Sequence, residues 1–292
     1  MTLNKFLTLN KALKLYSNKK IFLITGHKTF KFLEKKKIHL KLKKLKYLNI
    51  YFKKESVPQY RELKTLIIEC KKTNPDVIIG LGGGTVIDYA KLTRFFLHEQ
   101  KIIFDANKIL LNKKKLKKLI CIPTTCGSGA ESTTFSVLYK KNKKYSLNNQ
   151  LMIPDFYSLI PEYLINMPKK IATPPALDVF AQTLESIMSL NSNKKSLKFS
   201  YKSLNILGKN IFKYLQTRNF HSTKEMAMAA NFAGKAINIS KTTGPHALSY
   251  IFTSKYGIPH GRAVFMSLKY FLQINYNGSS KNKSLQKKFK KI

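Results

Sequence analysis

Acidic residues, tryptophan and cysteine are scarce in this sequence of 292 residues. It has 14 Asp and Glu, no Trp and three Cys, and none of the cysteines stands in a metal-type pair. Three such cysteines argue against a disulfide framework and favour a reducing, cytoplasmic setting. No run approaches the roughly 18 apolar residues of a membrane span, and the start lacks the apolar block of a signal peptide. The sequence predicts a soluble cytoplasmic protein with no membrane partner; an organellar address in the Lys-rich residues 1–20 is the alternative.

Arginine is also rare, although the chain is strongly basic. Of 54 basic residues only Arg61, Arg94, Arg218 and Arg262 are arginines, and the formal net charge is +40. A basic surface attracts phosphate groups, but surfaces that grip phosphates or base edges usually use arginine as well. The lysine runs occur throughout the chain and are typical of AT-biased coding. The composition therefore favours no specific nucleic-acid partner, and a basic nucleic-acid-binding protein stays an alternative that depends on charge alone.

Short apolar runs and helical patterns alternate in the first half of the chain. The runs at 21–25, 77–81 and 120–123 each end in a turn, and residues 60–72 have a helical apolar spacing. This order predicts a parallel sheet with helices on its faces. After Pro154 four prolines, the last at 174 and 175, predict a linker. Helices are then predicted at 176–189, 195–214, 223–239 and 263–274, and a frayed Lys-rich end from residue 277.

A glycine triplet follows the second apolar run directly. Gly82, Gly83 and Gly84 precede a helix start that contains Thr85 and Asp88. Glycines let backbone N–H groups approach a pyrophosphate closely, and a helix N-terminus adds partial positive charge. Thr85 and Asp88 also resemble a capping box. We predict that this turn binds a nucleotide; a tight strand-to-helix turn without a ligand is the alternative.

A second turn, residues 122–133, follows the third apolar run and is rich in hydroxyl groups and glycine. Its Thr124, Thr125 and Thr133 offer donors and acceptors suited to ribose and phosphate oxygens. Ligands of parallel sheets bind at the carboxyl ends of the strands, so two such turns support a nucleotide site better than one. Cys126 has no adjacent His or carboxylate and is predicted to be a packed small residue.

Residues with ligand-type side chains gather in the helical half of the sequence. Asp178 and Gln182 lie one turn apart on one face of a predicted helix, where two side chains can meet one ion. His246 follows a Gly-Pro pair that suits a helix start, and His260 stands between a proline and a glycine that can fix its imidazole. A single histidine is more often a core or surface residue, but these two differ from the other histidines because proline or glycine residues flank them. We call them the framed histidines. These four side chains are candidates for a metal site.

The order of these motifs resembles that of the iron-containing (group III) alcohol dehydrogenases. The resemblance runs from about residue 76 to residue 275 and includes the triplet with Thr85, Asp88 and Lys91, the second turn through Glu131, the segment 177–185 and the two framed histidines. It implies the dehydroquinate synthase-like architecture: an α/β dinucleotide-binding domain over residues 1–160 and an all-α metal-binding domain over residues 161–292. A cleft between them would hold a nicotinamide cofactor and a divalent metal, iron rather than zinc. Family members continue with further helices, so the C-terminal domain is expected to be incomplete.

The resemblance also implies roles for individual residues. The implied cofactor contacts are Gly82, Gly83, Gly84, Thr85, Asp88, Thr124, Thr125, Thr133 and Lys144, which matches a family lysine that reaches the cofactor ribose. Asp178, His246 and His260 are implied metal ligands, with Gln182 where most relatives have a fourth. We predict His246, His260 and Lys241 as the catalytic residues.

Three departures from the family pattern bear on the chemistry. Gln182 replaces a metal-binding His, and a neutral amide oxygen is a weaker ligand than imidazole. Tyr250 replaces a further His, which leaves the proton donor unassigned. Gly26 replaces an Asp that binds the adenine ribose in NAD-preferring relatives, and Lys28 is close in sequence, so NADPH is favoured over NADH.

A narrower likeness, in residues 185–193 and 234–243, is to the phosphonoacetaldehyde reductase branch. Lys241, Thr242, Thr243 and Arg262 flank the framed histidines and offer cations and hydroxyls to a phosphonate. The leading hypothesis is a homodimeric, metal-dependent reductase that converts a small aldehyde, such as phosphonoacetaldehyde, to the alcohol with NAD(P)H. The alternative is a degenerate member that binds nucleotide only, motivated by Gln182 and the short C-terminus.

Overall fold

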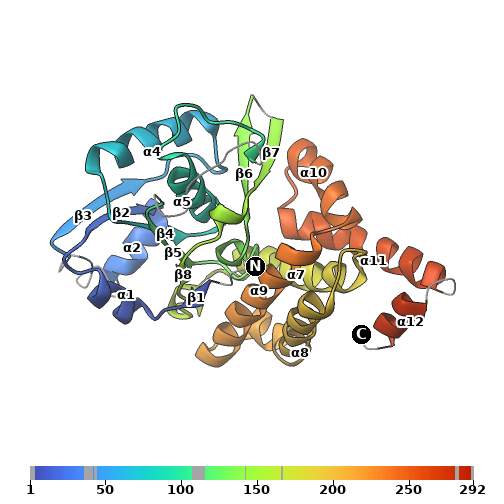
Figure 1. Ribbon diagram of the computed structural model, residues 1–292. Coiled ribbons are helices and arrows are strands. Elements are labelled where there is room, and N and C mark those ends of the chain that lie inside the picture. Colours follow the sequence, from blue (N-terminus) through green and yellow to red (C-terminus); the bar gives the residue numbers. More distant parts are fainter. Residues whose placement is uncertain are drawn as a thin grey trace. The chain divides into compact units, whose positions relative to one another are not determined.

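A computed structural model describes residues 4–35, 42, 45–106, 116–141, 143–165, 167–279 and 283–290. The chain divides into two compact units. Unit 1 comprises Met1–Thr124 and Ala130–Tyr163, and unit 2 comprises Thr125–Gly129 and Leu164–Ile292. In Figure 1 unit 1 runs from blue to yellow-green, and the helices of unit 2 run from yellow to red. The predicted order of an α/β half and a helical half is confirmed.

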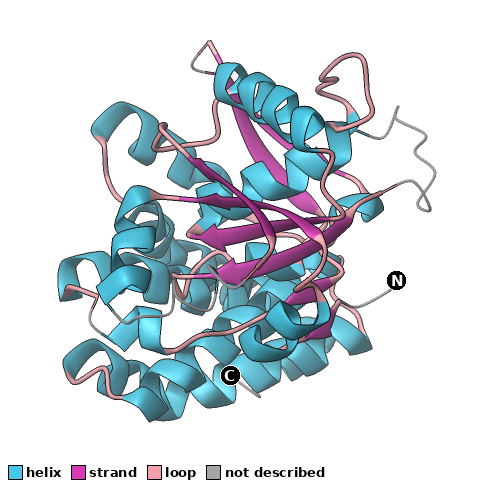
Figure 2. Cartoon of the chain, turned by 90° about the vertical axis from the view of Figure 1, so that its left-hand side faces the viewer, coloured by secondary structure: helices cyan, strands magenta, loops and turns pink. Residues whose placement is uncertain are grey.

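Unit 1 is built on a six-stranded parallel sheet with the strand order β1-β8-β5-β4-β2-β3. Its strands are β1 (Lys5–Phe6), β2 (Lys20–Thr25), β3 (Tyr47–Phe52), β4 (Val77–Gly82), β5 (Lys118–Pro123) and β8 (Phe156–Tyr157). Its helical elements are α1 (Leu9–Leu15), α2 (His27–Lys35), α4 (Tyr60–Thr73), α5 (Gly84–Phe96) and the short turns η3 (Ala130–Ser132) and η4 (Gln150–Met152). An antiparallel ribbon, β6 (Phe135–Lys140) and β7 (Lys143–Asn148), completes it. Figure 2 shows the strands side by side with helices on both sides of the sheet.

The core of unit 1 lies between β4 and its covering helices. Every residue of β4 is buried, as expected for a central strand of a parallel sheet. A Cβ on Gly80 would lie 2.7 Å from the Cβ of Ala90, so α5 packs on β4 at a distance that only glycine allows. At the end of the pair, Gly82 is in register with Pro123, and Thr124 N–H donates to the Gly82 carbonyl at 2.9 Å. The two turns predicted from the sequence therefore leave neighbouring strands at the same edge of the sheet.

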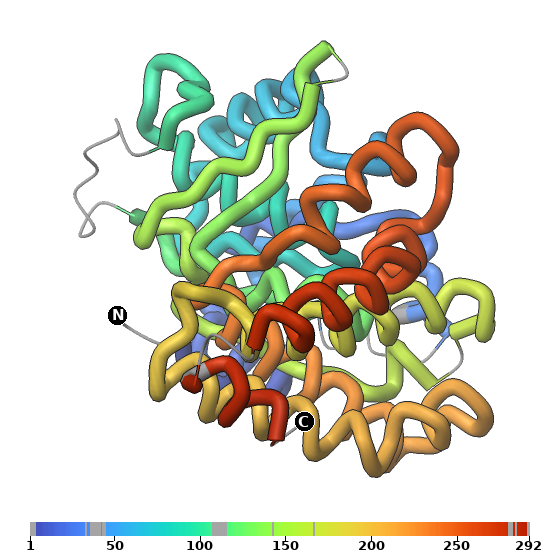
Figure 3. Tube along the Cα trace, turned by 90° about the vertical axis from the view of Figure 1, so that its right-hand side faces the viewer, coloured from blue at the N-terminus to red at the C-terminus, as the bar shows by residue number. Residues whose placement is uncertain are grey.

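Unit 2 is a set of packed helices, coloured from yellow to red in Figure 3. They are α7 (Lys169–Met188), α8 (Lys194–Gln216), α9 (Phe220–Ser240), α10 (Gly244–Tyr256), α11 (His260–Gly278) and α12 (Lys283–Phe289), preceded by the short α6 (Glu162–Ile165). Local sequence sets their starts: Asn193 forms a capping box with Ser196, and the Asn219 side chain accepts from Ser222 N. Buried serines and threonines of α7, α8 and α9 hydrogen-bond to one another, as Thr183 does with Ser203 at 2.8 Å and Ser200 with Ser186 at 2.9 Å.

The predicted linker through Pro175 is wrong, because α7 begins at Lys169 and contains both Pro174 and Pro175. Each proline lacks the N–H that would bond the carbonyl four residues before it, Lys170 and Ile171 in this helix. Those two residues are exposed, so water can satisfy their carbonyls. The helix that carries Asp178 therefore starts two turns earlier than the proline pattern predicts.

The predicted frayed end is also wrong for residues 283–289, which form α12. Phe289 lies edge-on to Tyr276, with ring centroids 5.6 Å apart, and packs against the apolar cluster that includes Ala181 and Leu268. Lys288 adds polar contacts to this apolar one, because its Nζ donates to the Ser189 carbonyl at 3.4 Å and to Ser192 Oγ. Over the residues described, no helix combines the length and apolar character needed to cross a bilayer.

Candidate functional site

The glycine turn of unit 1 leaves the first turn of α5 without a side-chain cap. The N-cap is Gly83, with no side-chain hydrogen bond, so the capping box expected from Thr85 and Asp88 is not formed. Thr85 Oγ1 donates instead to the Ser56 carbonyl at 2.9 Å, and Asp88 Oδ2 accepts from Val137 N at 3.3 Å. A Cβ on Gly82 would lie 2.5 Å from Val86, so glycine is required there. Uncapped N–H groups at a helix start are a suitable site for a phosphate.

A buried lysine ties this helix to the second turn. Lys91 Nζ donates to the Ala130 carbonyl at 3.1 Å, to Thr133 Oγ1 at 3.0 Å and to the Phe135 carbonyl. Burial lowers the pKa of Lys91 to about 8, against the opposing effect of the Asp88 charge. Burial also raises the pKa of Asp88 to about 6, although Lys91 and the Val137 N–H act the other way. Thr133 is thus held by Lys91, and Lys144 in β7 lies close enough for its charge to act on Asp88.

The second turn is shared between the two units. Thr124 and residues from Ala130 onward belong to unit 1, whereas Thr125–Gly129 belong to unit 2. A Cβ on Gly127 would lie 2.8 Å from the Cβ of Pro175, and Gly129, with φ of +57°, would place one 2.6 Å from Gly234. Glycine is therefore required at 129 both for the left-handed backbone and for close packing. Cys126 is buried, in agreement with the prediction of a packed residue.

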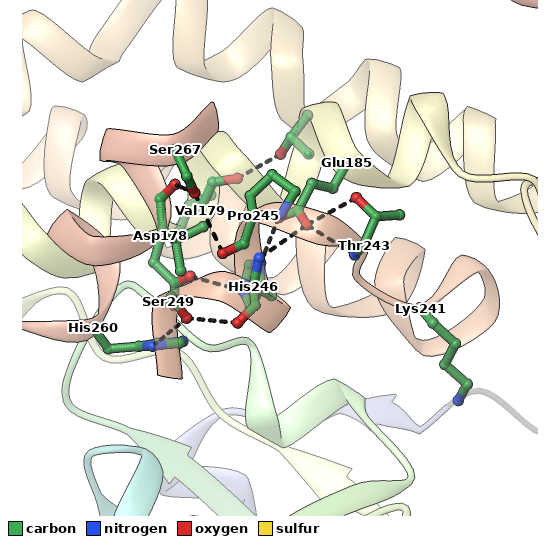
Figure 4. A network of polar contacts seen from close by, with 12 residues as sticks. Asp178, Val179, Glu185, Lys241, Thr243, Pro245, His246, Ser249, His260 and Ser267 are labelled. Atoms are coloured by element: carbon green, nitrogen blue, oxygen red, sulfur yellow. Dashed lines mark hydrogen bonds and ion pairs between the residues drawn. The ribbon is translucent and has the colours of Figure 1, made fainter. Parts of the chain in front are cut away.

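Three of the four side chains predicted to bind metal come together in unit 2. Asp178 in α7, His246 in the first turn of α10 and His260 at the start of α11 each offer a ligand atom, and these atoms lie within 4.8 Å of one another. Asp178 and His246 are only 5% and 6% exposed. Carboxylate and imidazole are ligands of iron and zinc. Figure 4 shows the three side chains pointing toward one another from three helices.

The approach of α11 to α7 makes this meeting possible. A Cβ on Gly261 would lie 1.8 Å from the Pro174 carbonyl oxygen and 3.0 Å from the Cβ of Asp178. Only glycine therefore lets the start of α11, with His260, lie beside Asp178. Pro259 is the N-cap of this helix, and Pro245 occupies the first turn of α10, where a missing N–H has no cost.

Gln182 provides a test of whether these residues fit a metal. It is 3% exposed and hydrogen-bonds Asp178 one turn away. Its Oε1 is a buried acceptor to which no group of the described chain donates, and Asp178 Oδ1 likewise accepts no hydrogen bond, with His246 Nε2 as an ionic neighbour at 3.2 Å. Buried oxygens normally find a donor. A cation beside these two oxygens would satisfy both, so the residues present fit a divalent metal with one weak amide ligand.

Without a metal, His246 is held between two carboxylates. Burial alone lowers its pKa, but the neighbouring carboxylates of Asp178 and Glu185 outweigh burial and raise the pKa to about 9. Burial raises the pKa of Asp178, and the opposite effects of His246, His260 and Gln182 bring it below the ordinary value. Asp178 and His246 thus form an ion pair within the cluster, with His246 Nε2 3.2 Å from Asp178 Oδ1.

Two further residues singled out from the sequence, Lys241 and Tyr250, are not among the candidate metal ligands. Lys241 has φ of +63° and its Nζ donates to the Asn238 carbonyl at 3.3 Å; Figure 4 shows its side chain pointing away from His246 and Asp178. The structure thus does not bring this predicted catalytic residue to the cluster. Tyr250 stacks on His260, with ring centroids 6.4 Å apart and an interplanar angle of 8°.

Glu185 and Ser249, for which no role is predicted from the sequence, also lie at the cluster. Glu185 is fully buried and contacts Thr243 and His246. Ser249 Oγ donates to the His246 carbonyl at 2.7 Å and lies 3.4 Å from His260 Nδ1. The spacing of Glu185, seven residues after Asp178, places both on one face of a helix and is a signal that was available in the sequence.

Two family models match the chain over nearly its whole length. Residues 3–161 match the iron-containing alcohol dehydrogenase model, and residues 171–292 match the C-terminal model of the same family. The chain belongs to the iron-containing alcohol dehydrogenase family. This confirms the resemblance on which the predictions of nucleotide and metal depend.

Individual relatives differ in their activities. The chain is 28% identical over 214 residues to a 4-hydroxybutyrate dehydrogenase of Clostridium kluyveri, a match that covers 70% of this chain and 57% of that protein. It is 27% identical over 212 residues to a phosphonoacetaldehyde reductase of Streptomyces viridochromogenes, with 69% and 53% covered. The matched region therefore spans little more than half the length of these two relatives.

Solved structures confirm the fold. An iron-containing alcohol dehydrogenase of Thermotoga maritima has a TM-score of 0.86 at 24% identity, with 100% of this chain and 82% of that one covered. A sulfoacetaldehyde reductase of Bifidobacterium kashiwanohense, solved in complex with NAD+, has a TM-score of 0.83 at 22% identity, with 93% and 74% covered.

Proposed function

We propose that this chain reduces a small aldehyde to the alcohol with NAD(P)H and a divalent metal. The observation that carries the proposal is the cluster of Asp178, His246 and His260, whose ligand atoms lie within 4.8 Å of one another. Membership of the iron-containing alcohol dehydrogenase family supports the reaction class.

The residues of unit 2 would hold the metal. Asp178 supplies negative charge, His246 and His260 supply imidazole nitrogens, and Gln182 Oε1 supplies a neutral oxygen. When bound, a divalent ion acts as a Lewis acid that polarises a carbonyl oxygen. The burial of Asp178 and His246 keeps water from competing with the substrate at this place.

The residues of unit 1 would hold the cofactor. The uncapped N–H groups after Gly83 suit the pyrophosphate, and Lys91 fixes the backbone that follows the second turn. Bound NAD(P)H supplies the hydride. Gly26 leaves room beside β2, since the nearest atom to a Cβ there is Lys53 Cε at 3.8 Å. The absence of a carboxylate at this position supports NADPH over NADH.

An aldehyde that carries an anionic group is the substrate class we favour. Three relatives named above act on 4-hydroxybutyrate, phosphonoacetaldehyde and sulfoacetaldehyde, each of which is anionic. The net charge of +40 favours the approach of an anion to this chain. Arg262, exposed and next to Gly261 at the start of α11, is a candidate partner for that group.

An aldehyde screen tests the proposal. Purified chain loaded with Fe²⁺ or Zn²⁺ would be given phosphonoacetaldehyde, sulfoacetaldehyde, succinic semialdehyde and neutral propanal, each with NADH and with NADPH. We expect NADPH oxidation that needs metal and is faster for the anionic aldehydes than for propanal. Chain that binds neither cofactor nor metal would refute the proposal, and equal rates for propanal would refute the preference for an anion.

Gln182 motivates one competing function, a member that binds nucleotide without reducing a substrate. Restoring imidazole by Gln182→His separates the two. If the amide has made the chain inactive, Gln182→His creates turnover that the wild type lacks. If the amide is a working ligand, the wild type already turns over and Gln182→His changes the rate without creating it.

A further inference from the structure

A buried carboxylate beside the metal cluster has no Lys or Arg as an ion-pair partner among the residues that the structure describes. Glu185 in α7 has no exposed surface and lies two helical turns after Asp178. Burying a carboxylate costs several kcal/mol unless its oxygens are satisfied. The hydrogen-bond partners of Glu185 therefore indicate its role.

The two oxygens of Glu185 have different neighbours. Oε1 accepts from Thr243 N at 2.8 Å, from Thr243 Oγ1 at 3.0 Å and from His246 N at 3.4 Å. Oε2 contacts Nδ1 of the His246 ring. Figure 4 shows these contacts converging on the loop before α10 and on its first turn. Three donors thus fix the orientation of the carboxylate, and its second oxygen is left for the imidazole.

The contact with Nδ1 determines where the His246 ring carries its proton. A neutral imidazole has one N–H and one lone pair, and an ionised carboxylate can only accept. The neutral ring must therefore donate Nδ1–H to Glu185 and keep its lone pair on Nε2. Nε2 is the atom that faces Asp178 Oδ1, at 3.2 Å, on the side of the proposed metal.

We propose that Glu185 is a positioning residue that holds His246 in the Nδ1–H tautomer, so that Nε2 is the metal ligand. This inference rests on the proposed function, because it needs a metal at Asp178, His246 and His260. Ser249 Oγ, 3.4 Å from His260 Nδ1, stands in the equivalent place for the second imidazole. Such partners of ligating histidines contribute about 10- to 100-fold to metal affinity.

The substitution Glu185→Gln distinguishes tautomer control from simple packing. The amide oxygen must face the three donors at Oε1, because the NH₂ group would meet N–H and O–H donors there. The NH₂ group then faces Nδ1, which must accept, and the ring proton moves to Nε2. A glutamine therefore keeps the shape and the contacts with Thr243 but turns the ligand nitrogen of His246 into a donor.

The experiment measures the Zn²⁺ affinity of the full chain by competition with a chromophoric chelator. We expect Glu185→Gln to bind Zn²⁺ at least 10-fold more weakly than the wild type. The matched control is Glu62→Gln in unit 1, a buried carboxylate that accepts from Glu55 N at 3.0 Å and from Tyr89 OH at 2.7 Å. It should bind Zn²⁺ within about twofold of the wild type. Equal affinity of Glu185→Gln and the wild type would overturn the proposal.

A second measurement does not depend on whether Glu185→Gln folds. Long-range ¹H–¹⁵N spectra of the Zn²⁺-loaded wild type, with His246 assigned by His246→Asn, report which ring nitrogen carries the proton. We expect a protonated Nδ1 and a ligated Nε2; a ligated Nδ1 would overturn the proposal even if the chain binds Zn²⁺ tightly. A wild type that binds no Zn²⁺ would overturn the proposed function and this inference together, so the two failures are distinguishable.

Discussion

The nucleotide turn of unit 1 and the metal cluster of unit 2 are built in opposite ways. The turn is one continuous stretch, Gly82 to Asp88, whose expected binding groups are backbone N–H groups at the start of α5. The cluster takes one side chain from each of three helices, α7, α10 and α11. The turn therefore depends on local backbone conformation, whereas the cluster depends on how closely the helices pack. Substitutions that leave the ligands in place but push helices apart should harm only the cluster.

The largest expected effect is that of Gly261→Ala. Its Cβ would lie 1.8 Å from the Pro174 carbonyl oxygen, a backbone atom that cannot rotate away. We expect a loss of about 3 kcal/mol or more in the free energy of unfolding and loss of metal binding, measured by thermal melting and metal titration. The matched control is Gly208→Ala in α8, where a Cβ meets nothing within 4 Å and helix propensity should add about 0.5–1 kcal/mol. Wild-type metal binding by Gly261→Ala would contradict the packing account.

The next effect should separate the two regions functionally. His260→Ala removes a proposed metal ligand from unit 2 and leaves the residues of the nucleotide turn intact. We expect NADPH-dependent aldehyde reduction to fall at least about 100-fold, while NADPH affinity, measured by fluorescence, changes less than about twofold. His221→Ala, at an exposed histidine of α9, should change neither quantity. Turnover that survives His260→Ala would remove the metal cluster from the mechanism.

The free energy of unfolding of the metal-free chain should depend on pH through the cluster. The pKa of His246 is about 9 in the folded state, above the ordinary value of about 6.5 for an unfolded histidine. Its charged form therefore stabilises the fold fully below about pH 6.5, and this stabilisation is lost as the pH rises through about 9. We expect the difference in unfolding free energy between wild type and His246→Gln, in chelator, to shrink over that interval. Because Lys91 titrates in both proteins, its contribution cancels in the difference between wild type and His246→Gln. A difference that stays constant over this pH interval would contradict the raised pKa of His246.

The smallest expected effect concerns the cofactor in unit 1. Gly26→Asp adds a carboxylate where we propose that the adenine ribose of the cofactor binds. A Cβ at this position would lie 3.8 Å from Lys53 Cε, so there is room for the side chain. Repulsion of a 2′-phosphate should weaken NADPH binding about 10-fold, or about 1.4 kcal/mol, without weakening NADH. Gly26→Asn has the same shape without the charge and should change the ratio of the two affinities much less. Equal losses for both cofactors would indicate a steric effect.

The same contrast explains how much could be predicted from the sequence. The turn of Gly82 to Gly84 and the framed histidines were found because each has a local signature of glycine or proline. Asp178 was found by its helical spacing and by family resemblance; nothing in the sequence shows that it lies beside His246 and His260, which are 68 and 82 positions away.

The errors arise where contacts between distant residues decide the structure. The Thr85 and Asp88 pattern predicts a cap, but Thr85 donates to Ser56 and Asp88 accepts from Val137. Pro174 and Pro175 predict a linker, but they lie within α7, against which Gly261 packs. The role of Lys241 stays a prediction that depends on its place next to Thr242 and Thr243 in sequence, and Figure 4 shows its side chain pointing away from His246.

The most direct measurement is the metal content of the chain at equilibrium with Zn²⁺, determined by elemental analysis after gel filtration. The account predicts about one tightly bound ion per wild-type chain and almost none in the double variant Asp178→Ala, His260→Ala. Circular dichroism would check that both proteins are folded. One ion per chain in both proteins, or none in the wild type, would contradict the claim that Asp178, His246 and His260 share a metal.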